Sequence, residues 1–270
     1  MAIQNRRAHG VTPGLSQDYV TRTADRQAAF VLPYLRPDMN LLDIGCGPGS
    51  ITLGLARAVA PGHVTGIDHD REHIRAARAL AVERGITNVT FQIGDALSLS
   101  FEEDTFEAAF ENNVLTHLAQ DAPRAAREAY RVLKPQGFFA VRDVDADSVV
   151  WGNMSESIKQ LDKLFITWHK SRGSDITIGK QLPSILRSAG FTDTIKSVSA
   201  DTKGNPKEIR SHADITISLL EGPFGRDIVA EGWASESEVE HLKESIRAWG
   251  KHPDAFFANI HVEVIGWKPD

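Results

Sequence analysis

Three glycines at alternate positions follow an acidic residue in the stretch LLDIGCGPGS, residues 41–50. Gly45, Gly47 and Gly49 stand between an apolar run and a helical pattern, so the backbone can turn sharply there and pass close to a ligand. Asp43 lies just before them, where a carboxylate would repel a pyrophosphate and attract a cation. The dinucleotide fingerprint also needs a glycine at position 50, which is a serine here, so the spacing disfavours NAD.

Two more acidic residues follow the next two predicted strands. Asp68 ends the second strand, a position that suits a carboxylate accepting both hydroxyls of a ribose. Asp95 lies in a tight turn after the third strand and suits an acceptor for the exocyclic amine of adenine. Each acid alone could simply cap the next helix. Together, at successive strand ends, they favour a ligand with an ammonium, a diol and an aminopurine but no phosphate, and S-adenosylmethionine has these features.

Alternating strand and helix patterns bring these residues to one edge of a sheet. The pattern predicts helices at 25–35, 50–59, 71–84 and 122–133 and strands at 40–44, 63–67, 89–93, 106–110 and 138–142. Such alternation implies a parallel sheet with helices on both faces. The expected fold class is α/β, a Rossmann-like doubly wound sheet of seven strands, mostly parallel with an antiparallel last strand, plus a helical cap.

The second half of the chain is less regular. Its apolar spacing predicts helices at 158–168, 179–190 and 207–249, the last interrupted at Gly222-Pro223, and strands at 194–198 and 256–267. We expect an N-terminal helical lid at 1–39 and a Rossmann-like cofactor-binding domain at 40–144, 178–199 and 256–270. The segments at 145–177 and 200–255 are expected to form a helical cap that selects the substrate.

The composition disfavours several classes of partner. The 270 residues carry a formal net charge of −6 without a basic stripe, which disfavours nucleic acid. No apolar run is long enough for a membrane span, and the N-terminal segment lacks the apolar core of a signal peptide. Cys46 is the single cysteine, so a reducing compartment, the cytoplasm, is expected. We expect a small-molecule substrate and a monomer or homodimer.

The motifs along the chain resemble those of class I S-adenosylmethionine-dependent methyltransferases, in particular the small-molecule group of UbiE type. Besides the glycine loop, the resemblance rests on VTGIDHD (64–70), GDAL (94–97), FEAAFENNVLTHL (106–118), RVLKPQGFFAVRD (131–143) and GKQLPSILRSAGF (179–191). Residues 19–24 and the pattern AWGKHPDAFF extend it over nearly the whole chain. Glu107 stands where an Asp is usual, and Gln136 replaces the first glycine of the common Pro-Gly-Gly turn. The motif ENNVL is not of the Asn-Pro-Pro-Tyr type, which argues against methylation of amino groups in adenine or glutamine.

The resemblance implies a role for several residues in binding the cofactor. The three glycines of the loop would pass close to the methionyl part, and Asp68 would hold the ribose. His69 would pack beside the adenine, and Asp95 with Ala96 would meet its polar edge. The remaining implied contacts are the backbone of Asn112, a lid residue Tyr19 and a carboxylate partner Arg22.

Methyl transfer from a sulfonium is an in-line displacement, so the protein mainly aligns the nucleophile, the methyl carbon and the sulfur. A phenol, thiol or amine acceptor could need a base, and the candidates by position or chemistry are His117, Asp143, His169, His212 and His261. Asp143 ends the fifth predicted strand and is the acid expected to face the pocket, whereas His117 could instead be structural. His69 and His73 have the spacing of two metal ligands, but no third ligand is apparent and no metal is expected.

Three other functions stay open at this point. A nicotinamide-dependent dehydrogenase could use the same kind of sheet, although the glycine spacing disfavours it. A protein could keep the cofactor pocket without methylating, for example to catalyse a rearrangement or to sense the cofactor. Methylation of a protein or RNA is disfavoured by the acidic charge.

Overall fold

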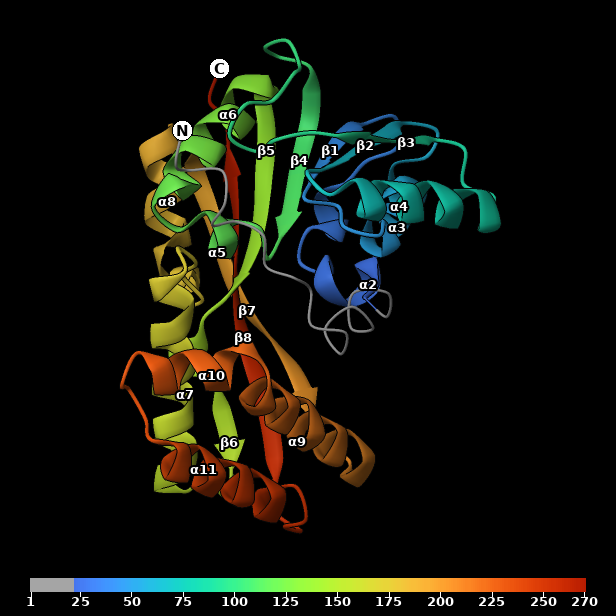
Figure 1. The fold of residues 1–270 in the computed structure, drawn as a ribbon. Coiled ribbons are helices and arrows are strands. Elements are labelled where there is room, and N and C mark those ends of the chain that lie inside the picture. The colour runs from blue at the N-terminus through green and yellow to red at the C-terminus, as the bar shows by residue number, and fades with distance from the viewer. Residues whose placement is uncertain (1–21) are drawn as a thin grey trace.

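Five parallel strands form the first half of the sheet in the computed structural model, which describes residues 22–270 (Figure 1). They are β1 (Asn40–Ile44), β2 (His63–Asp68), β3 (Val89–Ile93), β4 (Phe106–Asn112) and β5 (Leu133–Val144). Their spatial order is β3-β2-β1-β4-β5. The chain moves outward in one direction from β1 to β3 and in the other from β4 to β5. The point between β1 and β4 is therefore a topological switch point, where sheets of this kind bind ligands.

Three antiparallel strands complete the sheet. β8 (Phe256–Trp267) pairs with β5 and also with the short β6 (Val150–Gly152), while β7 (Thr192–Lys203) pairs with the other edge of β8. The α/β fold class with its mostly parallel sheet is confirmed, although the sheet has eight strands instead of seven. The additional strand is β6. β8 extends beyond the end of β5, so the backbone groups of its first residues do not pair with β5. They form hydrogen bonds with β6 instead.

Helices cover both faces of the parallel strands (Figure 1). They are α2 (Ala24–Gln27), α3 (Ser50–Val59), α4 (Arg71–Glu83), α5 (Leu115–Leu118), α6 (Ala122–Val132) and α8 (Leu182–Ala189), while α7 (Glu156–Ser171) belongs to another group. α6 and α8 pack on the face that carries Ala109 and Val141, and α2 and α3 pack on the face that carries Phe110 and Ala140. Because successive strand residues face opposite sides, strands covered on both faces are apolar almost throughout.

A second group of helices lies beyond the carboxyl ends of the parallel strands, around the far ends of β7 and β8 (Figure 1). It consists of α7 with α9 (Pro206–Glu221), α10 (Pro223–Ala230) and α11 (Glu236–Trp249). Its own apolar core includes Phe224, Ile228 and Trp249, each at most 2% exposed. Capping boxes at Asn205 and Ser235 begin α9 and α11 and satisfy amides that would otherwise lack partners.

Several predicted elements agree with the structure at both ends. These are the strands at 40–44, 89–93 and 256–267 and the helix at 50–59. The predicted break at Gly222-Pro223 separates α9 from α10. None of the helices in residues 22–270 has the length and apolarity that a membrane span requires.

The predicted helix at 25–35 is wrong, because the structure has only α2 and a 3-10 turn at Leu32–Tyr34. Pro33 has no amide hydrogen for the carbonyl four residues earlier, and it restricts the residue before it. Pro183 shortens the predicted helix at 179–190 in the same way, so a 3-10 turn at Ile178–Gln181 precedes α8. The strands predicted at 138–142 and 194–198 are parts of longer strands, since pairing with β8 continues past their apolar residues.

Candidate cofactor site

The glycine loop joins β1 to α3 at the switch point of the sheet. All three glycines are left-handed, with φ of 72° at Gly45, 53° at Gly47 and 84° at Gly49, a conformation that a side chain disfavours. A Cβ at Gly45 would lie 2.3 Å from Val114 Cγ2, and one at Gly49 would lie 2.9 Å from Ala77 Cβ. A Cβ at Gly47 would meet no described atom within 4 Å. The loop is therefore packed on its protein side and open at Gly47, where a ligand can approach the backbone.

Asp68 ends β2 beside this loop and is nearly buried. Its Oδ2 accepts the amide of Gly47 and its Oδ1 accepts the amide of Asp70, both at 2.9 Å. Burial alone would raise the pKa of Asp68, but the hydrogen bonds from His73 and the two amides outweigh it, and the pKa falls below its usual range. The carboxylate is ionised, and its remaining lone pairs can accept a ribose hydroxyl. One side chain can thus cap the loop and bind a ligand.

Asp43 lies near the end of β1 and is 2% exposed. Its Oδ2 accepts the hydroxyl of Thr52, in the first turn of α3, at 2.6 Å. Burial raises the pKa of Asp43 to about 7 against the opposing effect of the Thr52 hydrogen bond, and the charge of Asp68 raises it further. A buried carboxyl in this state stabilises a nearby cation, because the cation offsets the cost of ionising it.

The residues expected around an adenine gather at the ends of β2 and β3. Asp95 is exposed, and its Oδ1 accepts the backbone amide two residues later at 2.9 Å. His69 is exposed as well, and its ring Nδ1 lies 3.4 Å from Asp68 Oδ1. Ala96 packs against the core below. A planar base could therefore lie at this edge between exposed polar groups and an apolar surface.

The structure describes two of the three residues expected at the methionyl end of the cofactor, Arg22 and Asn112. Tyr19 lies outside the described residues. Arg22 is the first described residue and is half-buried. Asn112 ends β4, the strand that pairs with β1 just before the glycine loop. Its side chain is almost buried and accepts a hydrogen bond from Arg142 of β5 at 2.9 Å.

The three residues expected to act as bases lie on separate elements. His117 is exposed on α5. His169 is half-buried on α7, with its ring centroid 4.6 Å from that of Phe165. Asp143 is fully buried and accepts the amide of Thr116, in α5, at 3.1 Å. The carboxyl of Asp143 therefore faces α5, on the side of the sheet opposite α2, and not the open part of the glycine loop.

Asp143 has a buried partner that the sequence analysis missed. Glu111 of β4 is fully buried, and its pKa is raised well above its usual range, first by burial and then by the charge of Asp143. Burial raises the pKa of Asp143 to about 7 as well. The two carboxyls hold a proton between them, because two like charges cannot both ionise in this enclosed position. The sequence did hold a signal for this pair. Glu111 interrupts an apolar strand, and an acid in a strand covered on both faces needs a buried partner.

Both His69 and His73 lie beside Asp68. His73 Nδ1 lies 3.4 Å from Asp68 Oδ1, and the hydrogen bond to this carboxylate raises the pKa of His73. Residues 22–270 contain no group of three histidine, cysteine or acidic side chains that could hold a metal ion. Of the other two histidines considered as bases, His212 is half-buried and His261 is buried, and desolvation lowers their pKa values to about 4 and about 3.

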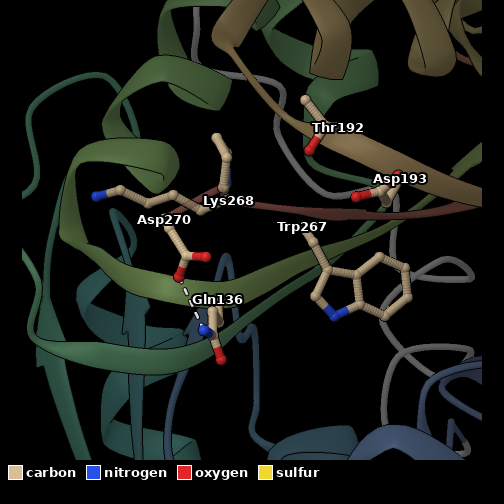
Figure 2. Close-up of a pocket in the computed structure, with 7 residues that line it drawn as sticks. Gln136, Thr192, Asp193, Trp267, Lys268 and Asp270 are labelled. Atoms are coloured by element: carbon tan, nitrogen blue, oxygen red, sulfur yellow. Dashed lines mark hydrogen bonds between the residues drawn. The ribbon is translucent and has the colours of Figure 1, made fainter.

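A separate hollow lies at the other end of the sheet from the glycine loop. Its lining comes from the start of β5, the start of β7 and the C-terminal segment (Figure 2). Gln136 Nε2 donates to Asp270 Oδ1 across it at 2.8 Å. Because doubly wound sheets bind ligands outside the carboxyl ends of their strands, this hollow is not part of the candidate site.

Comparison with known proteins identifies a family for more than half of the chain. The family described as "Methyltransferase domain" matches residues 35–190. A probable methyltransferase of Aspergillus luteorubrus, ltbC, is 27% identical over 272 residues, which cover 92% of each chain. The chain spans only about half the length of two other curated relatives.

Solved structures share the fold. YcgJ from Bacillus subtilis has a TM-score of 0.60 at 20% identity, covering 90% of this chain and 98% of that one. A cyclase named SpnF has a TM-score of 0.53 at 25% identity, covering 95% of this chain and 81% of that one. These likenesses agree with the Rossmann-like architecture expected from the sequence.

Proposed function

The chain belongs to the methyltransferase-domain family, and from this we propose that it transfers the methyl group of S-adenosylmethionine to a small molecule and leaves S-adenosylhomocysteine. The geometry of the glycine loop carries the proposal. The loop is open at Gly47 and flanked by the ionised Asp68 and the buried Asp43. A phosphate would meet two acids there, whereas a phosphate-free nucleoside with positive charges would be stabilised.

The proposed roles follow the order of the strand ends. Asp43 favours the ammonium of the methionyl part, which passes over the three glycines. Asp68 accepts the ribose hydroxyls while it keeps its hold on the loop. His69, Asp95 and Ala96 border the adenine. Each of these contacts uses a group that the structure brings to one edge of the sheet.

Bound S-adenosylmethionine supplies an activated methyl group, so the protein has to hold the acceptor in line with it. Such alignment can contribute about 7–11 kcal/mol to lowering the barrier. This proposal requires no base among His117, Asp143 and His169, because the methyl donor is already activated. They remain candidates for proton transfer only if the acceptor must lose a proton during the reaction.

We also propose the division of the chain. Residues 40–144, 178–199 and 256–270 would bind the cofactor, 145–177 and 200–255 would form the cap that selects the acceptor, and 1–39 would form a lid. The separate core of α7, α9, α10 and α11 supports the cap. We further propose that the enzyme is of UbiE type and cytoplasmic, as a monomer or homodimer; the lone, buried Cys46 is consistent with a reducing compartment.

One observation favours a second function. The solved structure with 25% identity is a cyclase, so the chain could keep the cofactor site and catalyse a reaction other than methylation. The two functions share the same binding site and differ in whether the methyl group leaves the cofactor.

Calorimetry with S-adenosylmethionine, S-adenosylhomocysteine and NAD tests the binding site. We expect binding of the first two and none of NAD. Asp68→Ala should weaken the affinity, whereas Asp214→Ala, an exposed acid on α9, should not. Binding of NAD in place of S-adenosylmethionine would contradict the proposal. A panel of phenols, amines, thiols and quinones with labelled methyl donor then separates methylation from a reaction that leaves the label on the cofactor.

A further inference from the structure

A row of polar side chains continues the α2-facing side of the sheet beyond its apolar residues. On that side, β4, β5 and β8 carry Phe110, Ala140 and Ile265 in the buried core. The next positions toward the carboxyl ends of β4 and β5 are polar. β7, which pairs with β8, contributes further polar side chains to the same side of the sheet. This polar row consists of Asn112, Arg142, Glu263, His261, Ser199 and Asp201. It begins beside the glycine loop, because β4 pairs with β1 there.

Arg142 organises the polar row. Its side chain is 1% exposed, and its Nη1 donates to Asn112 Oδ1 at 2.9 Å. Its Nε donates to Ser199 Oγ at 3.1 Å, and its Nη2 donates to Asp201 Oδ2 at 3.2 Å. Glu263 Oε1 lies 3.5 Å from Nε. Because a guanidinium only donates, it determines which end of each neighbouring side chain faces it.

Asn112 is left with a buried donor. Its oxygen must face Arg142, so its Nδ2 points elsewhere. That nitrogen is buried and has no hydrogen-bond partner among the described residues. A buried amide nitrogen without a partner carries a cost of about 1–3 kcal/mol, which a ligand oxygen would relieve. The nitrogen belongs to β4, the strand beside β1, which leads into the glycine loop.

His261 remains neutral and orients toward the end of β4. Asn113 Oδ1 accepts the amide of Val144 at 3.2 Å, so Asn113 Nδ2 faces His261 Nε2, at 3.5 Å. The imidazole therefore accepts through Nε2. Burial, and after it the charge of Arg142, lowers the pKa of His261 to about 3. His261 thus adds no charge to the polar row at ordinary pH.

Fixed charges of both signs surround the polar row. Arg142 lies within it, the charge of Arg22 acts on His261, and the charge of Arg26 acts on Asp201. The carboxylates of Asp201 and Glu263 lie in the row as well. Both carboxylates are already engaged, since Asp201 accepts from Arg142 and Glu263 Oε2 accepts from Ser197 Oγ at 2.6 Å.

From this arrangement, and resting on the proposed function, we infer that the acceptor binds along the polar row and is methylated on an acidic oxygen, that of a phenol, an enol or a carboxylic acid, which enters as its anion. The Asn112 amide donates to that oxygen, and the surrounding guanidinium groups stabilise its negative charge. An amine would enter as an ammonium, which has no lone pair to accept the Asn112 amide, and both carboxylates of the row are already engaged.

The transfer step balances without a base. The acceptor has already lost its proton to solvent when it binds as an anion. A bond forms between its oxygen and the methyl carbon as the carbon–sulfur bond breaks, and the electron pair of that bond neutralises the sulfonium. The product is a methyl ether or ester and a thioether, and no proton moves in the step. This accounts for a site whose histidine is neutral and whose carboxylates, Asp201 and Glu263, are engaged by Arg142 and Ser197.

The test uses the full chain loaded with S-adenosylhomocysteine and two probes of similar shape. 4-Nitrophenol reports its ionisation by colour, and 4-nitrobenzylamine carries a positive charge. We expect nitrophenol to bind as the phenolate, about tenfold tighter than the neutral phenol, and nitrobenzylamine to bind weaker than nitrophenolate. Failure of S-adenosylhomocysteine to bind would defeat the proposed function. Normal cofactor binding with no nitrophenolate binding, or with tighter binding of the amine, would overturn only this inference.

Two charge variants sharpen the test. Asp201→Asn removes a partly exposed negative charge and should tighten nitrophenolate binding by about tenfold while weakening that of the amine. Arg26→Gln, at an exposed residue of α2, should weaken nitrophenolate binding by about twofold. The matched control is Arg127→Gln on α6, at the opposite face of the sheet, which should change neither. The affinity for S-adenosylhomocysteine should be the same in all three. If Asp201→Asn does not fold, the nitrophenolate affinity of Arg26→Gln is the deciding measurement. An affinity equal to that of the parent would overturn the inference.

Discussion

Replacing Asp43 by Asn should stabilise the fold increasingly as the pH rises. Burial raises the pKa of Asp43 from 3.8 to about 7, and each pKa unit corresponds to about 1.4 kcal/mol, so ionising it costs the folded state about 4 kcal/mol. The folded protein binds this proton more tightly than the unfolded chain does. The stability that this proton contributes to the folded protein is therefore lost as the pH rises from the pKa of Asp43 in the unfolded chain through its pKa in the folded protein. An amide does not titrate, so Asp43→Asn escapes this loss.

Urea unfolding followed by circular dichroism measures the effect. We compare the free energies of unfolding of the variant and the parent at each pH. The variant's advantage should be smallest at about pH 4 and larger by about 4 kcal/mol above about pH 8. The amide can add a constant of its own through its bond to Thr52, but that constant is the same at every pH. The exposed Asp25→Asn is the matched control. A difference that stays flat across this range would refute the reasoning about Asp43.

The same carboxyl makes a prediction about binding. A cationic ligand beside Asp43 would lower its pKa, so S-adenosylmethionine should release protons when it binds near neutral pH. Calorimetry in two buffers with different heats of ionisation measures this release. Asp43→Asn should abolish it and weaken binding by about 10–100-fold, the range for a hydrogen bond to a charged group. Proton release that persists in the variant would place its source elsewhere.

Three further perturbations test other parts of the structure. Asp68→Ala should weaken cofactor binding by about 1.5–3 kcal/mol in calorimetry, and Asp68→Asn should weaken it less, because the amide oxygen can still accept one loop amide. Gly49→Ala forces a methyl group to 2.9 Å from α4 at φ 84° and should lower the free energy of unfolding by about 1–3 kcal/mol, whereas Gly204→Ala, with open space around it, should be nearly neutral. Glu111→Gln replaces the proton shared with Asp143 by a permanent amide hydrogen, so the melting temperature should fall less between about pH 6 and about pH 9 than in the parent; an identical fall would show that the pair does not titrate there.

Local chemistry explains which predictions from the sequence agreed with the structure. The limits of β1, β3 and α3 follow from apolar runs bounded by glycines and polar residues, and those signals lie within a few residues of the element. The glycine loop was recognisable for the same reason, since left-handed residues must be glycine or pay a steric cost. The helix predicted at 25–35 failed because apolar spacing was weighed without the effect of Pro33.

The buried polar groups could not be found this way. Glu111 is a buried acid whose partner, Asp143, comes from another strand. The polar row joins Arg142 to Asp201 and Glu263, three residues that meet only because β5 and β7 both pair with β8 in a given register. Nothing in the spacing of these residues along the chain indicates that register.

The sequence by itself determined the α/β architecture, the glycine loop and the acids at the strand ends, because each depends on a short stretch of chain. Only the tertiary structure decided which buried carboxyls lie together, which way Asn112 presents its amide, and which charged groups surround it. Those properties depend on distances between strands, and a pKa or a hydrogen bond changes with a few ångströms that no residue pattern encodes.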